Sequence, residues 1–137
     1  MREDLRAMLI REEGLRLRLY KDSVGKFTIG VGHNIEDNGI TEAAAYFILD
    51  EDIAKASTEA LKLPVFIILD QVRQDVIVNM IFNMGLSGVM GFKYMLAALS
   101  VQDWEEAAIQ MLNSKWASQV GNRALELAAM IRTGEYQ

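Results

Sequence analysis

The sequence predicts a predominantly helical α+β fold, in which a small N-terminal β-hairpin lobe and a larger helical lobe enclose a cleft. Changes in the spacing of apolar residues support this prediction. They recur first at helical spacing, then alternate with arginines over residues 15–19, and return to helical spacing after residue 41. A cleft between two such lobes is a natural binding site.

The N-terminal helix and the hairpin meet at a glycine. Leu5, Met8 and Leu9 have helical spacing, and the helix is expected to end immediately before Gly14. Residues 15–19 alternate leucine with arginine, which is typical of a half-buried strand. The boundary between helix and strand is therefore expected at residues 13 and 14.

A turn and a long helix follow. Residues 22–25 have Asp first and Gly fourth, which is typical of a β-turn, and residues 26–29 offer the second strand of a hairpin. Thr41 is expected to cap a helix over residues 41–60. Pro64 ends or redirects that helix, because proline cannot continue one.

Two later helices have recognisable ends. Asp70 can cap a helix over residues 72–84, and Gly85 marks its carboxyl end, where left-handed backbone is usual. Asp103, followed three residues later by Glu106, resembles the capping box at the start of another helix.

A length of 137 residues is typical of one domain. We expect a single domain over residues 1–137, with a small lobe at about 14–40 and a linking helix at about 41–60. The helical lobe is expected at about 60–137 and also includes the N-terminal helix. A chain of this size can bury a core without disulfides or a structural metal.

The composition excludes several functional classes. The sequence has no cysteine, which excludes disulfides, thiolate metal sites and cysteine nucleophiles. The formal net charge of -5 argues against a protein that neutralises nucleic-acid phosphates. We therefore expect no nucleic-acid partner.

No targeting or membrane segment is expected. Glu3 and Asp4 follow the first basic residue, unlike a secretory signal. The longest uncharged stretch, Val76–Phe92, contains polar residues and glycines and is shorter than the ~20 apolar residues of a membrane span. We expect no stable membrane insertion.

Glu13 is the first candidate for chemistry. It lies at the expected carboxyl end of a helix, where a negative charge opposes the helix dipole. If it is also partly buried, the pKa of its carboxyl group should be raised, as a general acid near neutral pH requires. A solvated structural glutamate is the alternative on local grounds.

Asp22 and Thr28 have ordinary structural interpretations, because aspartate opens turns and threonine favours strands. The hairpin can nevertheless carry Asp22 toward Glu13. Cleavage of a glycosidic bond needs two carboxyl groups facing across the sugar, one protonated and one ionised. The Thr28 hydroxyl can then hold the attacking water.

Other suggestive residues favour structural roles. His33 lacks the clustered partners of a metal ligand, so a structural histidine is expected. The acidic residues 50–52 lie in a helical pattern without a calcium-binding loop, so we expect a solvated face and no metal site. Phe82, Phe92 and Trp116 lie in helical patterns more typical of core.

Short motifs extend over nearly the whole chain. Those near the N-terminus are Glu12-Glu13-Gly14-Leu15-Arg16-Leu17, Tyr20-Lys21-Asp22 and Thr28-Ile29-Gly30-Val31-Gly32-His33. Later motifs include Asn38-Gly39-Ile40-Thr41, Phe82-Asn83-Met84-Gly85, Gly91-Phe92, Ser114-Lys115-Trp116, Asn122-Arg123-Ala124 and Arg132-Thr133-Gly134. With these motifs the chain resembles the phage-type lysozyme family, whose members are also called endolysins or muramidases. Within this family it resembles most the lysozymes of the T-even bacteriophages.

The resemblance implies roles for individual residues. It makes Glu13 the catalytic acid, Asp22 the second carboxylate and Thr28 the hydroxyl that positions water. It also implies a structural ion pair between His33 and Asp52. Roles in binding the substrate or supporting the site are implied for Gly32, Phe82, Asn83, Phe92, Trp116 and Arg123, of which Arg123 pairs with the catalytic acid.

The resemblance also implies the reaction and its setting. It implies hydrolysis, with inversion, of the β-1,4 bond between N-acetylmuramic acid and N-acetylglucosamine in bacterial peptidoglycan. No metal or organic cofactor is expected. We expect a monomer that accumulates in the host cytoplasm, reaches the periplasm and cell wall at lysis, and depends on a holin-type protein for access.

One departure from the family leaves alternatives open. Between His33 and Asn38 the chain is shorter than the T-even lysozymes, so part of the small lobe is missing and the resemblance does not extend to the outer sugar or peptide subsites. One alternative is a catalytically weak peptidoglycan-binding module that retains the lysozyme fold. A lytic transglycosylase, which leaves anhydromuramic ends, is less favoured because Asp22 is present. Asp22 can act as a base or can stabilise positive charge on the sugar.

Overall fold

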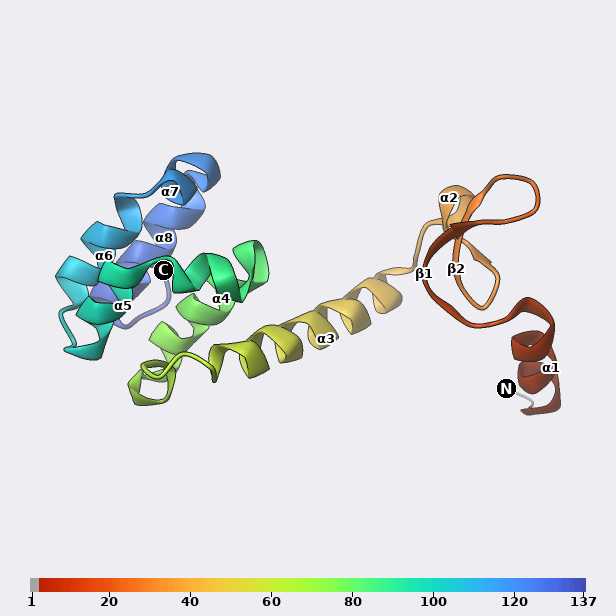
Figure 1. Cartoon of the computed structure of the whole chain (residues 1–137), viewed down its shortest axis with the longest axis horizontal. Helices are drawn as coiled ribbons and strands as arrows, with labels where there is room; N and C mark the ends of the chain where they lie inside the picture. The colour runs from red at the N-terminus through yellow and green to blue at the C-terminus, as the bar shows by residue number, and fades with distance from the viewer. Residues whose placement is uncertain (1–2) are drawn as a thin grey trace. The chain divides into compact units, whose positions relative to one another are not determined.

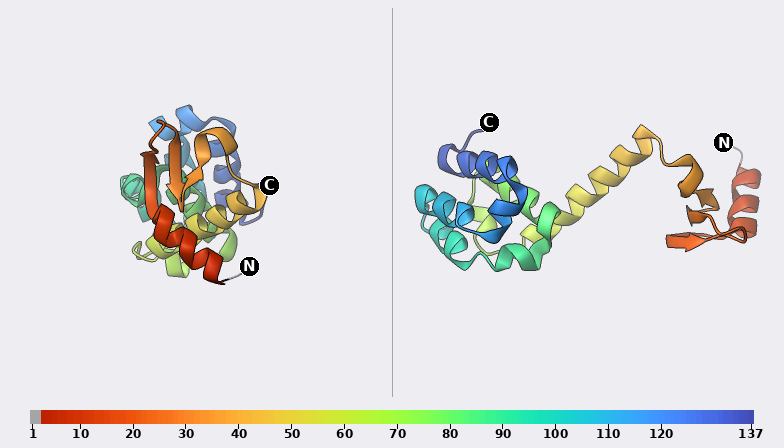
Figure 2. Two further views of the ribbon diagram at one scale, coloured as in Figure 1. Left: turned by 90° about the vertical axis from the view of Figure 1, so that its right-hand side faces the viewer. Right: turned by 90° about the horizontal axis from the view of Figure 1, so that it is seen from above.

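The computed structural model describes residues 3–137. Met1 and Arg2 lie outside the described residues, and so does this part of the segment for which no secretory signal is expected. The chain divides into a first unit that ends at Phe47 and a second unit, Ile48–Gln137, with the boundary inside helix α3 (Glu42–Ala60). Figures 1 and 2 show the predominantly helical α+β fold that the sequence predicts. The limits of the lobes, including the place of the N-terminal helix, stay predictions.

The first unit contains one substantial helix and a small sheet. The predicted helix end is confirmed, because Gly14 has φ +77° and its N–H donates to the Ile10 carbonyl at 2.8 Å. The left-handed glycine turns the chain from the helix into the sheet. Before α3, the elements are α1 (Glu3–Glu13), β1 (Arg16–Lys21), β2 (Phe27–Gly30), β3 (His33–Asn34) and α2 (Ile35–Asn38).

The sheet is antiparallel, with strand order β1-β2-β3. The predicted hairpin is confirmed, and Tyr20 lies opposite Thr28, with an irregular register nearer Arg16. The expected half-burial of the leucines at 15, 17 and 19 is wrong, since all three are exposed. The reason is that Thr28 is the one buried residue among residues 3–47, so no core of the first unit lies against β1.

Helix α3 begins where the sequence predicts. The Thr41 hydroxyl accepts a hydrogen bond from the Ala44 N–H at 3.1 Å, as an N-cap should. The helix ends at Ala60, before Pro64 and the short 3-10 helix η1 (Phe66–Ile68). Residues 50–52 are exposed on α3, which agrees with a solvated acidic face.

Helix α4 (Gln71–Met90) starts as predicted but extends further. The Asp70 side chain caps it by accepting the Arg73 N–H at 3.4 Å. Gly85 has φ +83° and ψ +163°, so the predicted left-handed break is present. Residues after Gly85 return to helical geometry, and the predicted end is therefore a kink within a longer element.

The second unit is a helical bundle around an apolar core (Figures 1 and 2). Helix α6 packs against α5 and α8. The later helices are α5 (Lys93–Ser100), α6 (Trp104–Leu112), α7 (Lys115–Val120) and α8 (Asn122–Thr133). The largest fully buried side chains are Ile77, Met80, Met95, Leu99, Met111, Ile131, Val76 and Val89.

A buried arginine ties α4 to α8. The Arg73 Nε donates to the Ile131 carbonyl at 2.7 Å, and its Nη1 donates to Asp70 Oδ1 at 2.9 Å. The guanidinium also lies 3.9 Å from the centre of the Trp104 ring. These contacts satisfy a charge that would otherwise be costly to bury.

Within residues 3–137, no single helix is long and apolar enough to cross a membrane. Helices α4 and α5 reach that length and hydropathy only together, across a bend of 99°.

Candidate active site

The Glu13 side chain packs against the backbone of Gly32, at the turn between β2 and β3. A Cβ atom added to Gly32 would lie 2.7 Å from Glu13 Oε2, and Gly32 has φ +63°. A side chain at residue 32 would therefore press on the end of the Glu13 side chain in this arrangement, and the role of Gly32 in supporting the site stays a prediction. The structure leaves Glu13 exposed, so the partial burial expected from the sequence is not present.

Glu13 lines a hollow of the first unit with a volume of about 450 Å³. Its lining comes from α1 and from the β2–β3 turn, and so includes both Glu13 and Gly32. The lining residues are Arg6, Leu9, Ile10, Glu13, Val31 and Gly32. Arg6 places a cation in the same hollow as the candidate acid, and nothing in the sequence pattern singled it out.

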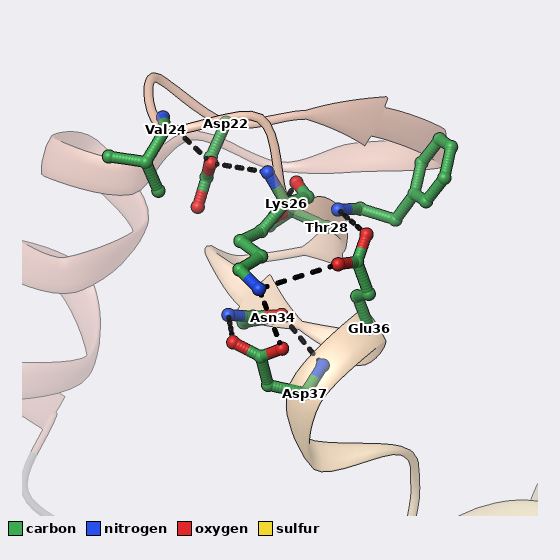
Figure 3. Close-up of polar contacts among 8 residues, drawn as sticks. Asp22, Val24, Lys26, Thr28, Asn34, Glu36 and Asp37 are labelled. Atoms are coloured by element: carbon green, nitrogen blue, oxygen red, sulfur yellow. Dashed lines mark hydrogen bonds and ion pairs between the residues drawn. The ribbon is translucent and has the colours of Figure 1, made fainter.

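Asp22 opens the hairpin turn, as its structural interpretation predicts. Its Oδ1 accepts the N–H groups of Val24 at 3.0 Å and Lys26 at 2.8 Å (Figure 3). Its backbone carbonyl accepts the Gly25 N–H at 3.0 Å. Oδ2 accepts no hydrogen bond from the part of the chain that the structure describes, so one oxygen remains available for water or substrate.

Thr28 lies on β2, and its side chain is turned inward. Its Oγ1 donates to the Lys26 carbonyl at 2.9 Å, and the residue is only 2% exposed. The backbone of Lys26 thus contacts both Asp22 and Thr28 (Figure 3). The sequence analysis did not predict this link through Lys26, because no motif marks it.

Three of the predicted substrate-binding residues come together in the second unit. The Trp116 Nε1 donates to Asn83 Oδ1 at 2.7 Å. The Phe92 and Trp116 rings meet edge to face, with centroids 6.0 Å apart. Phe92 and Trp116 line a hollow of about 340 Å³ that also includes Lys93 and Lys115.

Phe82 and Arg123 line another hollow of the second unit, of about 430 Å³. Arg123 is held there by Asn79, whose Oδ1 accepts from Arg123 Nε at 3.0 Å and Nη2 at 2.8 Å. The predicted pairing of Arg123 with Glu13 joins residues of different units and stays a prediction.

His33 has a structural contact within the first unit. Its Nε2 lies 2.6 Å from the Gly39 carbonyl oxygen. Asp52 lies on α3 in the second unit, so the predicted His33–Asp52 ion pair also stays a prediction. Among residues 3–137, no group of three or more His, Asp or Glu side chains is placed to hold a metal ion.

Comparison with known proteins identifies the family. The sequence profile described as "Phage lysozyme" matches residues 10–132. The chain belongs to the phage lysozyme family. The matched range includes Glu13, Asp22, Thr28 and Arg123, and membership supports a lysozyme of the general glycoside hydrolase type.

Relatives of the chain include proteins of phages and of Dictyostelium discoideum. It is 30% identical to probable T4-type lysozyme 1 of Dictyostelium discoideum, over 98% of this chain and 96% of that protein. It is 32% identical to an endolysin of Acyrthosiphon pisum secondary endosymbiont phage 1, over 91% of this chain and 86% of the endolysin. It is also 31% identical to the pre-baseplate central spike protein Gp5 of Enterobacteria phage T4, over 95% of this chain but 28% of Gp5.

Proposed function

We propose that this phage lysozyme hydrolyses the β-1,4 bond between N-acetylmuramic acid and N-acetylglucosamine in bacterial peptidoglycan. The observation that carries the proposal is the different environment of two carboxylates in one unit. Glu13 faces an open hollow and packs against glycine, whereas Asp22 is oriented by two backbone N–H groups. Two carboxyl groups in different environments are what glycoside hydrolysis requires.

In the proposed reaction, Glu13 gives its proton to the oxygen of the leaving sugar as the glycosidic bond breaks. A water attacks the anomeric carbon from the opposite face and transfers a proton to Asp22, so the sum of the steps is the addition of one water. The open Oδ2 of Asp22 and the Thr28 hydroxyl direct that water.

The proposed setting is lysis of a bacterial host. The enzyme acts as a monomer on glycan strands, collects in the host cytoplasm, and reaches the periplasm and wall through a holin-type protein. Two relatives named as endolysins support this proposal, one from Acyrthosiphon pisum secondary endosymbiont phage 1 and one from Salmonella phage P22. Coexpression with and without a holin, followed by the loss of culture turbidity, tests it.

Mass spectrometry of digested peptidoglycan tests the reaction. Wild type is expected to release fragments with reducing muramic acid ends. Glu13→Gln is expected to lose at least ~100-fold in rate, because a positioned general acid contributes that much or more. Glu12→Gln is the matched control, since it removes the same charge from an exposed neighbour on α1 and should leave the rate near wild type.

The same digest separates the alternatives. Anhydromuramic ends would identify a lytic transglycosylase. Binding to peptidoglycan without any release of fragments would identify a binding module. NMR of the first-formed product then tests inversion, since an inverting enzyme turns the β-linkage into the α-anomer before mutarotation.

A further inference from the structure

We propose that Lys26 is a positioning residue: carboxylates of α2 hold its side chain, and its backbone orients Asp22 and Thr28. The inference rests on the proposed function, because it concerns how the proposed catalytic group is held. It assigns a function to Glu36 and Asp37, which lie in the short segment between His33 and Asn38.

The backbone of Lys26 contacts both proposed water-directing residues. Its N–H donates to Asp22 Oδ1 at 2.8 Å, and its carbonyl accepts from Thr28 Oγ1 at 2.9 Å. The Lys26 carbonyl also accepts the Asp22 N–H at 2.9 Å and closes the turn. Any displacement of residue 26 therefore moves both Asp22 and Thr28.

The side chain of Lys26 extends to the single turn of α2. Its Nζ lies 3.2 Å from Asp37 Oδ1 and 3.5 Å from Glu36 Oε2 (Figure 3). Glu36 also accepts the Phe27 N–H through Oε1 at 3.2 Å. One lysine and two carboxylates thus join the hairpin to α2, and we call this group the Lys26 clamp.

The helical turn that supplies the carboxylates is itself braced. The Asn34 side chain caps α2 by accepting the Asp37 N–H at 3.0 Å, and its Nδ2 donates to Asp37 Oδ2 at 3.0 Å. Asp37 therefore has one oxygen bound to Asn34 and the other to Lys26. A helix of one turn is unstable alone, so these contacts determine where the carboxylates lie.

Packing cannot do this positioning, because Thr28 is the one buried residue among residues 3–47. The turn at residues 22–26 has no apolar core beneath it, and polar contacts are what remain to orient it. Reaction rates are sensitive to displacements of about 1 Å in a catalytic group. A weak surface contact can thus matter for rate while contributing little to stability.

Lys26 and Asp37 of the Lys26 clamp stabilise each other's charged form. The hydrogen bond and charge of Asp37, with a smaller contribution from Glu36, raise the pKa of Lys26 above its ordinary value of 10.5. Hydrogen bonds from Lys26 and then Asn34 lower the pKa of Asp37 below its ordinary value of 3.8. Added salt, more than a change of pH near neutrality, should therefore weaken the ion pairs of Lys26, because dissolved ions screen exposed charges.

The test combines kinetics with amide hydrogen exchange on the full chain. Lys26→Met should lower kcat by about threefold to tenfold with KM unchanged, since misplacement affects the reacting groups and not the outer contacts. In this same variant, the backbone amides of residue 26 and Val24 should exchange faster than in wild type. The unfolding midpoint should stay near that of wild type. Lys26→Arg should restore most of kcat.

A double-mutant cycle shows whether Lys26 acts through α2. The combined variant Glu36→Gln with Asp37→Asn should show the same loss of kcat as Lys26→Met. Adding Lys26→Met to it should lower kcat no further, because the effects of substitutions at contacting residues do not add. High salt should lower the wild-type kcat toward that of the variant. Arg132→Met is the matched control, since it removes the exposed Arg132–Glu105 ion pair of the second unit and should leave kcat unchanged.

Wild-type kcat and unchanged amide exchange in Lys26→Met would overturn the proposal, as would additive losses in the cycle. Failure of the proposed function looks different. In that case wild type releases no reducing ends, and faster exchange at the Val24 amide in Lys26→Met still supports the Lys26 clamp. Unchanged exchange in that case refutes it.

Discussion

The two units differ in how they are held together. The second unit buries apolar side chains from α3 to α8 around Ile77, Leu99 and Ile131, whereas among residues 3–47 only Thr28 is buried. The first unit nevertheless carries the proposed catalytic group. Apolar burial accounts for stability in the second unit, and hydrogen bonds, an ion cluster and glycine geometry account for the arrangement of the site in the first.

The largest effect on stability is expected from the core of the second unit. Leu127 is 3% exposed on α8. Leu127→Ala should cost about 2–5 kcal/mol in the free energy of unfolding, because it leaves a cavity in a packed core. Urea unfolding followed by circular dichroism measures this loss, and a change below 1 kcal/mol would contradict the contrast between the units.

A smaller stability change with a clear effect on activity is expected at Gly32. Gly32→Ala should cost about 1–2 kcal/mol for its left-handed backbone. The added Cβ would displace Glu13, and activity should fall by about tenfold to 100-fold. Gly121→Ala is the matched control, because Gly121 in the second unit also has φ +59° but nothing within 4 Å of an added Cβ. Equal losses of activity in both variants would argue against the Glu13 contact.

A pH-dependent effect is expected at the buried arginine. Partial burial alone would raise the pKa of Asp70, but the hydrogen bonds and charge of Arg73 outweigh it and hold the pKa below the ordinary 3.8. The stabilisation is present above pH 3.8 and is lost as pH falls through the lower folded pKa. The unfolding midpoint of Asp70→Asn should lie below wild type at neutral pH and converge with it in acid. A constant difference would contradict this sign.

The smallest effect is expected on the sheet. Leu17 is 81% exposed on β1. Leu17→Ala should change the free energy of unfolding by less than about 0.5 kcal/mol, as surface substitutions usually do. Denaturant unfolding of Leu17→Ala and Leu127→Ala under the same conditions compares the two losses in the free energy of unfolding directly. A cost above 1 kcal/mol would show that β1 is covered by another part of the protein.

Local signals in the sequence were sufficient for most elements. Gly14 ends α1, Thr41 and Asp70 cap their helices, and Asp22 opens the turn because each rule involves residues only a few positions apart. The same rules placed the end of a helix at Gly85. They failed there because a single left-handed residue does not stop helical geometry from resuming after it.

Contacts between distant residues were beyond such rules. The half-burial predicted for β1 assumed a core on one face, and alternation cannot show whether one is present. The bond from Arg73 to Ile131 spans 58 positions. Lys26, Glu36 and Asp37 have unremarkable sequence contexts, and only the hairpin and α2 together show why their charges matter.

The direction of one hydrogen bond has a consequence for the chemistry. The Thr28 hydroxyl donates its only hydrogen bond to the Lys26 carbonyl. Toward a water, its oxygen can therefore act only as an acceptor. The carboxylate of ionised Asp22 also accepts and does not donate. In the proposed reaction, a water bound by both donates one hydrogen bond to Asp22 and one to Thr28. Its lone pairs are then directed away from Asp22 and Thr28, which is the orientation of a nucleophile.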